Sequence, residues 1–349
     1  MEDQDKAWRK WVECWSLYSI FSFLKANDFV GSNTYPALAD LLPWPDEAIV
    51  AQRAFTYDAG FDLSITEWLR EELGEWWKDP MHTFTEGLSM LPWAFMEKNC
   101  HGWNRDVDLS EKIHYGFEVR SVEHPNAHTV KVIAYNKQTG KERVFHGDAV
   151  ILTVPMNILR QMDFNPKLPQ KYYKAIMNVN YAASTKIMVQ TKTRFWEKKG
   201  IKGGFSHTDL PIRQIHYPSD PDLEFKKERG ILMVYTWKQE ALLFGAQPEE
   251  SAVKEAVEEI AEIHPEIKDE FEVGAMQAWY TDYAAQGAFA MLKPQEYKAT
   301  KLLMFKPYHN IYFAGEALSW CNGWIQGALE SSLRAAYQFY TDNEKKRAN

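Results

Sequence analysis

The segment IYFAGEALSWCNGWIQGALESSLRAA, residues 311–336, decides the fold because it joins a short strand to a long helix through a glycine-containing loop. Residues 310–314 form a short apolar run that predicts a buried strand. A helix is predicted from about residue 323 to 340, because apolar residues recur there with the helical period: Ile325, Ala328, Leu329, Ala336, Tyr337 and Tyr340. A strand, a loop and a helix in this order indicate an α/β arrangement.

The start of the predicted helix carries two glycines, Gly323 and Gly327, that let a backbone approach a flat or anionic group closely. The free N–H groups of a helix start favour negative charge at the same place. A flavin fits such a site, since its reduced form is negatively charged at the pyrimidine end. Tight packing of the protein on itself explains these glycines about as well, so the loop alone leaves both interpretations open.

The rest of the chain alternates between predicted helices and strands. Helical periodicity is found at residues 7–26, 64–77 and 249–263. Ser64, followed three residues later by Glu67, is the pattern of a capping box. Alternating or continuous apolar runs predict strands at residues 130–135, 143–146, 148–154, 185–191 and 231–236. The run 148–154 is rich in β-branched residues, as in a strand buried in a parallel sheet.

Composition restricts the partners. The chain has 349 residues, of which 45% are hydrophobic, enough for a large core in about two or three domains. A net charge of −8 without a basic stripe argues against nucleic acid as a partner. Cys14, Cys100 and Cys321 are too few and too far apart for a disulfide framework or a metal site, which favours a cytoplasmic location. We also expect no membrane span and no signal peptide.

The quoted segment resembles the C-terminal flavin-binding signature of the flavin amine oxidase family. Four other segments resemble the family in its own order: TEGLSMLP (85–92), FEVRSV (117–122), DAVILTVP (148–155) and STKIMVQTKTRFW (184–196). The resemblance implies a mixed α/β (α+β) fold with an FAD/NAD(P)-binding-like flavin domain, a mixed-sheet substrate domain and a helical region. The expected bounds are 1–80 for the helical region, 81–180 with 305–349 for the flavin domain, and 181–304 for the substrate domain.

The segment GGFSHTDLPIRQIHYPSD, residues 203–220, is similar to L-amino acid oxidases within that family. The resemblance implies that Tyr217 binds the substrate carboxylate and that the carbonyl of Gly323 takes the amino group. It places Trp324 and Phe289 along the substrate. Such walls imply an apolar or aromatic L-amino acid.

The resemblance also implies bound FAD. Glu316 would contact the sugar-like hydroxyls of the cofactor, the backbone of Val119 its adenine, and Trp279 the side of the flavin. The helix start would lie along the cofactor with Gly323, Trp324, Ile325, Gln326, Gly327 and Ala328. No cysteine occurs around residues 287–292, where covalent attachment is usual, so FAD should be noncovalent. Lys186 would be the catalytic residue, held by a water to flavin N5, where a cation assists reoxidation by oxygen.

Two family features are missing from this sequence: the G-x-G-x-x-G turn for the FAD pyrophosphate and the arginine segment for the substrate carboxylate. We therefore expect an N-terminal Rossmann subunit or parent-chain segment as partner, and a homo-oligomer. The implied reaction takes an amino acid and oxygen to the imino or keto acid and hydrogen peroxide. Three alternatives stay open: a monoamine or polyamine oxidase, a decarboxylating monooxygenase, and a non-catalytic binding subunit.

Overall fold

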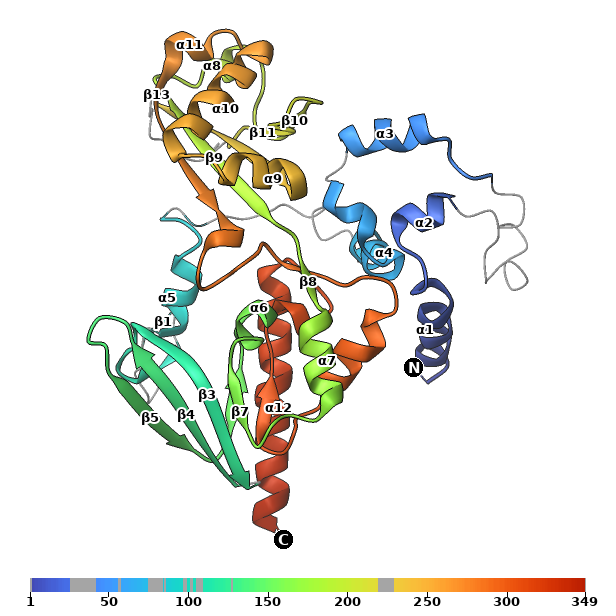
Figure 1. The fold of residues 1–349 in the computed structure, drawn as a ribbon, viewed down its shortest axis with the longest axis vertical. Helices are drawn as coiled ribbons and strands as arrows, with labels where there is room; N and C mark the ends of the chain where they lie inside the picture. The colour runs from blue at the N-terminus through green and yellow to red at the C-terminus, as the bar shows by residue number, and fades with distance from the viewer. Residues whose placement is uncertain are drawn as a thin grey trace.

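The structure is a computed structural model that describes residues 2–25, 42–55, 58–74, 84, 86–96, 99–100, 103–104, 109–126, 128–218 and 229–348. The N-terminal helices lie to one side, a five-stranded sheet with its helices lies at one end, and a four-stranded sheet lies beside the C-terminal helix (Figure 1). Helices and strands are mixed along the chain, which confirms the predicted fold class. The three domain boundaries stay a prediction.

The N-terminal part contains helices α1 (Glu2–Trp15), α2 (Ile20–Lys25), α3 (Asp46–Phe55) and α4 (Ile65–Gly74). The single helix predicted over 7–26 is wrong, because the chain turns between α1 and α2. Ser19 and Ser22 each accept a hydrogen bond from the other's backbone N–H, which caps α2. The capping box predicted before α4 is also wrong. The Ser64 hydroxyl contacts Thr66 instead, and the Glu67 carboxylate binds Lys301.

The four-stranded sheet has the order β5-β4-β3-β7. Its strands are β3 (Phe117–Asn126), β4 (Thr129–Asn136), β5 (Glu142–Gly147) and β7 (Asp163–Asn165). The strands predicted at residues 130–135 and 143–146 are confirmed, and β4 and β5 pair with each other in antiparallel register as a hairpin. Its turn is fixed by the Asn136 side chain, which accepts hydrogen bonds from the backbone of Gln138 and Thr139.

A parallel pair of strands precedes the C-terminal helix, as the sequence predicted. β6 (Val150–Leu152) pairs with β15 (Ile311–Phe313), and α12 (Ile325–Ala348) follows. Helices α6 (Met156–Leu159) and α7 (Gln170–Asn178) and the π-helix η5 (Lys298–Leu302) surround the pair. Within the described residues, each strand of this pair has only one neighbour. The face of α12 that carries Leu333, Tyr337 and Tyr340 is exposed.

The five-stranded antiparallel sheet has the order β10-β11-β12-β9-β13. Its strands are β9 (Ser184–Thr191), β10 (Phe205–His207), β11 (Gln214–His216), β12 (Gly230–Trp237) and β13 (Phe271–Ala278). One face packs on a large apolar core with helices α8 (Phe195–Lys198), α9 (Lys238–Gly245), α10 (Glu249–Ile263) and α11 (Ile267–Glu270). Strands β9 and β12 and helix α10 were predicted.

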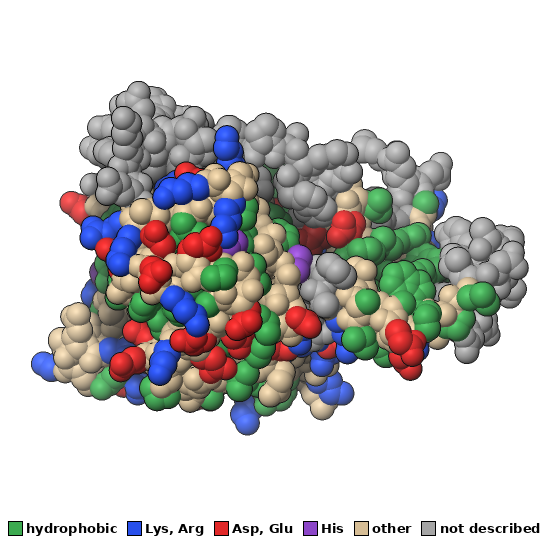
Figure 2. All heavy atoms as spheres, turned by 90° about the horizontal axis from the view of Figure 1, so that it is seen from above, with side chains coloured by type: hydrophobic (Ala, Val, Ile, Leu, Met, Phe, Trp, Pro, Cys, Tyr) green, Lys and Arg blue, Asp and Glu red, His purple; other side chains and the backbone are tan. Residues whose placement is uncertain are grey.

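Shorter elements complete the described chain: α5 (Met90–Met96), β1 (Asn99–Cys100), β2 (Trp103–Asn104), β8 (Asn180–Tyr181) and β14 (Ala290–Met291), with 3-10 turns η2 (Asp58–Asp62), η3 (Ser110–Lys112), η4 (Trp279–Thr281) and η6 (Glu316–Leu318). Among the described helices, none combines the length and the apolar character needed to cross a membrane. Figure 2 shows acidic and basic side chains intermixed over the large body, while hydrophobic side chains gather over the N-terminal helices, where Leu17, Phe21, Trp44 and Val50 are exposed.

Candidate functional site

Glu316 is a half-buried acid at the start of η6, just after β15, where the chain turns toward α12. Its two carboxylate oxygens accept hydrogen bonds from the backbone N–H of Ala290, at 2.9 Å, and of Gly323, at 3.0 Å. Burial raises the pKa of this carboxyl group. Because a carboxylate oxygen can accept more than one hydrogen bond, Glu316 can still bind a hydroxyl group. It therefore joins β14 to the glycine loop and suits the hydroxyl contact that the sequence predicted.

Gly323 in the loop and Gly327 in the first turn of α12 are glycines for different structural reasons. Gly323 has φ +78°, and a Cβ there would lie 3.3 Å from the Phe289 ring. A Cβ on Gly327 would lie 2.1 Å from the carbonyl oxygen of Cys321. Packing of the protein on itself thus explains Gly327. At the first turn of α12 the side chains of Ile325 and Gln326 are exposed, so the positive end of this long helix is open to an anionic group.

A chain of contacts leads from Lys186 to the glycine loop. The Lys186 Nζ lies 4.5 Å from the ring centroid of Tyr235. The Tyr235 ring lies 4.5 Å from that of Trp237, which is 5.5 Å from that of Phe289. Phe289 packs directly on Gly323. The predicted residues Lys186, Phe289, Gly323 and Glu316 are therefore brought together along one wall, although they come from widely separated segments.

Lys186 is half-buried on β9, and burial lowers the pKa of its ammonium group. Within the described residues, it forms no ion pair with a carboxylate. His216 lies on the same side of the sheet. Burial first, and then the charges of Lys186 and His207, lower the pKa of His216 to about 4. His216 is therefore a neutral imidazole at physiological pH, beside a cation that has no counter-ion in the described part of the chain.

Tyr217 does not lie on this wall. In the sheet, Lys186 pairs with Tyr235, while Ile215 pairs with Val234. Because side chains alternate between the two faces, Ile215 and Tyr217 project to the face opposite Lys186. Tyr217 is 2% exposed in the apolar core, where its hydroxyl contacts His264 at 2.7 Å and Ser206 at 2.8 Å. The structure therefore does not place Tyr217 with the other predicted site residues, and the neighbouring His216 projects to the Lys186 face instead.

The other predicted residues are less closely tied to the wall. Trp279 is 37% exposed and follows β13, whose Gln277 pairs with Lys186. Val119 lies on β3 in the four-stranded sheet and packs against the apolar core around β6 and β15. It lies outside the chain of contacts that begins at Lys186. Trp324, next to Gly323, is half-buried, and its indole Nε1–H donates to Glu71.

Comparison with known proteins shows the family of this chain. The sequence model of the flavin-containing amine oxidoreductases matches residues 17–338. The chain belongs to this family. The family recognised from the sequence is thereby confirmed.

Two relatives and two solved structures show how far the similarity of this chain extends. The putative L-amino-acid oxidase YobN of Bacillus subtilis is 32% identical over 80% of the chain and 57% of its own length. The L-amino-acid oxidase of Crotalus adamanteus is 27% identical over 80% of the chain and 52% of its own length. Cyclohexylamine oxidase from Brevibacterium oxydans has a TM-score of 0.56 at 15% identity, with 65% of this chain and 48% of that one covered. Wild-type putrescine oxidase bound to putrescine has a TM-score of 0.56 at 18% identity, with 64% and 48% covered. The chain thus spans about half the length of these proteins.

The chain also contains a buried group of charges that the sequence did not single out. The Lys301 ammonium is 0% exposed and donates to Glu67 and to Asn322, at 2.8 and 2.7 Å. Glu67 also receives a hydrogen bond from Arg70. This network connects α4 to the loop just before Gly323. Glu67 and Lys301 are separated by 234 residues, so no local sequence pattern could pair them.

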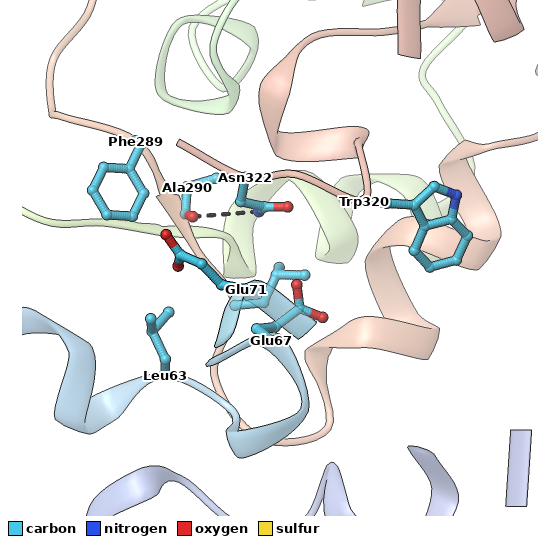
Figure 3. Close-up of a pocket in the computed structure, with 8 residues that line it drawn as sticks. Leu63, Glu67, Glu71, Phe289, Ala290, Trp320 and Asn322 are labelled. Atoms are coloured by element: carbon cyan, nitrogen blue, oxygen red, sulfur yellow. Dashed lines mark hydrogen bonds between the residues drawn. The ribbon is translucent and has the colours of Figure 1, made fainter. Parts of the chain in front are cut away.

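A small cavity of about 20 Å³ lies between α4, β14 and this loop (Figure 3). Its walls are Leu63, Glu67, Glu71, Phe289, Ala290, Leu292, Trp320 and Asn322. This volume holds one water-sized group. Figure 3 shows the Glu71 carboxylate pointing toward Phe289 and Ala290, whereas the Glu67 carboxylate points toward the side of Trp320. The cavity thus adjoins the predicted substrate wall.

Proposed function

We propose that this chain is the substrate-binding and part of the flavin-binding region of an FAD-dependent L-amino acid oxidase that forms hydrogen peroxide. The observation that carries the proposal is the continuous wall from Lys186 through Trp237 and Phe289 to Gly323. Membership of the amine oxidoreductase family supports it, as do relatives that are named L-amino-acid oxidases.

The residues present fit FAD bound without a covalent link. When bound, FAD accepts a hydride from the substrate Cα and is reoxidised by oxygen. The open start of α12 would face the anionic part of the cofactor, and Glu316 would accept from its hydroxyl groups. Lys186 would supply a fixed positive charge on the same wall, already partly desolvated. Cys321, the cysteine of this loop, is a half-buried free thiol whose pKa is raised by burial, and we assign it no bond to the cofactor.

The substrate would lie along the same wall. Its amino group would donate to the carbonyl of Gly323, and Phe289 and Trp324 would exclude water from its side chain. We assign its carboxylate to the Lys186 face of the sheet. His216 is our candidate for the contact in place of Tyr217, because its neutral imidazole projects to that face and can donate a hydrogen bond.

The proposal includes a partner that completes the flavin site. Within the described residues, β15 has one strand neighbour, although a parallel strand is normally paired on both sides and covered on both faces. Leu333, Tyr337 and Tyr340 form an exposed stripe on α12, each more than 60% exposed. An added parallel strand and its helix would cover both features. A dinucleotide-binding segment with the missing G-x-G-x-x-G turn has this strand-helix composition.

The first experiment is a visible absorbance spectrum of the purified chain with FAD, alone and together with the segment encoded next to it. We expect flavin bands in the completed protein and their bleaching when an L-amino acid is added without oxygen. Bleaching by simple amines but not by L-amino acids would replace the proposal with a monoamine or polyamine oxidase. Absence of bound flavin in both samples would leave a non-catalytic binding subunit.

A further inference from the structure

We propose that Glu71 forms a cation-binding subsite that selects substrates with a second positive charge, so that the preferred substrate is a basic L-amino acid. This inference rests on the proposed function, because it assigns the far end of the same substrate site. It replaces the expectation, made from the sequence, of an apolar or aromatic side chain. The aliphatic stem of a basic amino acid would lie against Phe289 and Trp324, and its charged tip would reach Glu71.

The position of Glu71 relative to Trp324 supports this subsite. Glu71 Oε1 accepts a hydrogen bond of 3.1 Å from the indole Nε1–H of Trp324. The indole nitrogen lies on the ring system, remote from the backbone, so Glu71 sits at the outer end of the Trp324 side chain while Gly323 sits at its inner end. A substrate that binds with its amino group at the carbonyl of Gly323 would therefore extend along the indole toward Glu71. Figure 3 shows the carboxylate facing Phe289, on the opposite wall.

The charges of the side chains that line the cavity also support this subsite. The two charged side chains that line the cavity are both carboxylates, Glu67 and Glu71. Glu67 already pairs with Lys301 and Arg70. Glu71 forms no ion pair within the described residues, and its hydrogen bond to Trp324 uses only part of its acceptor capacity. A partly buried carboxylate without a cation is costly, and the ammonium or guanidinium group of a ligand would relieve that cost.

An oxygen of Glu67 that has no hydrogen-bond partner among the described residues also supports this subsite. The Glu67 side chain is 8% exposed, and its Oε1 has no hydrogen-bond partner among the described residues, although Oε2 has two. Buried carboxylate oxygens are almost always hydrogen-bonded. A donor in the cavity would satisfy this atom from the same space that Glu71 lines. An ammonium group has three N–H donors and is small enough for this space.

The test compares L-lysine with L-norleucine, which has the same carbon skeleton and lacks the terminal amine. The FAD-loaded protein, completed by its dinucleotide-binding segment, is assayed for peroxide formation as wild type, Glu71→Gln and Glu72→Gln. Glutamine keeps an acceptor for the Trp324 indole and removes the charge. Glu72 is exposed on the same helix and controls for the loss of one negative charge. We expect wild type to prefer L-lysine, and the ratio of the two kcat/KM values to fall about tenfold or more in Glu71→Gln only.

Binding measured by titration calorimetry separates this inference from the proposed function. Oxidation of both substrates with equal kcat/KM, or equal losses on both in Glu71→Gln, would overturn the cation subsite and leave the oxidase. Binding of L-lysine over L-norleucine that depends on Glu71, without oxidation of either, would support the subsite and overturn the oxidase. Neither binding nor oxidation would overturn both.

Discussion

Tyr217 and His216 are adjacent in sequence and face opposite sides of the sheet, so paired substitutions test the assignment of the carboxylate contact. Tyr217→Phe removes a hydroxyl that contacts His264 and Ser206 and leaves the packed ring in place. Each buried hydrogen bond contributes about 1 kcal/mol net, and a partner left unsatisfied costs more, so we expect a loss of about 1–3 kcal/mol in the free energy of unfolding. Because the ring volume is unchanged, no cavity adds to this cost.

The assay combines urea unfolding, followed by tryptophan fluorescence, with steady-state kinetics on an L-amino acid and on the amine that lacks its carboxylate. Tyr217→Phe should lower stability and leave both KM values close to wild type. His216→Phe should raise the KM for the carboxylate-bearing substrate alone. A rise in that KM of about tenfold in Tyr217→Phe, with unchanged stability, would refute the face assignment and restore the prediction made from the sequence.

The remaining predictions concern Lys186 and His216 on the five-stranded sheet, and the buried pair of Lys301 and Glu67. Lys186→Met should slow reoxidation of the reduced enzyme by oxygen about tenfold or more, measured by rapid mixing, while anaerobic reduction by substrate changes little. As pH falls from 6.5 toward about 4, wild type should lose stability more steeply than His216→Gln: the folded pKa lies below the ordinary value of 6.5, so the unfolded chain takes up the proton first, which thermal unfolding across this range would show. Lys301→Met should destabilise by about 3–5 kcal/mol, because it leaves the Glu67 charge buried without its closest cation. Adding Glu67→Gln to that variant should recover much of the loss; urea unfolding of the two variants that shows equal stability would contradict this explanation.

The spacing of apolar residues was sufficient to predict the elements whose structure depends on residues close together in the sequence. The hairpin of β4 and β5, the parallel strand β6 and the amphipathic helix α10 follow from patterns within a few residues. The break between α1 and α2 was missed because it depends on two serines that cap each other, inside an apolar pattern that continues across the break. The family resemblance then placed Lys186, Phe289, Gly323 and Glu316, which no local pattern could bring together.

The face of a strand residue depends on register, and register depends on partners far away in sequence. Whether position 216 or 217 faces Lys186 is settled by the pairing of β11 with β12 and of β12 with β9. A slip of one residue moves a side chain to the other face, so an assignment that is correct to within one residue can still choose the wrong side chain. In this sheet, the residue at the preceding position is His216, whose environment keeps its imidazole neutral.

The buried charges argue that the N-terminal helices and the flavin-binding part function as one unit. Glu67 on α4 is separated by 234 residues from Lys301, which holds Asn322 at the loop before Gly323. Glu71, one turn further along α4, holds the indole of Trp324 directly after it. Each side of Gly323 is therefore positioned by a carboxylate from the same helix. Because a buried lysine without its carboxylate is strongly unfavourable, the loop can keep this conformation only while α4 is in place. We expect the helical region, predicted as a separate unit ending near residue 80, to support the proposed substrate site in this way.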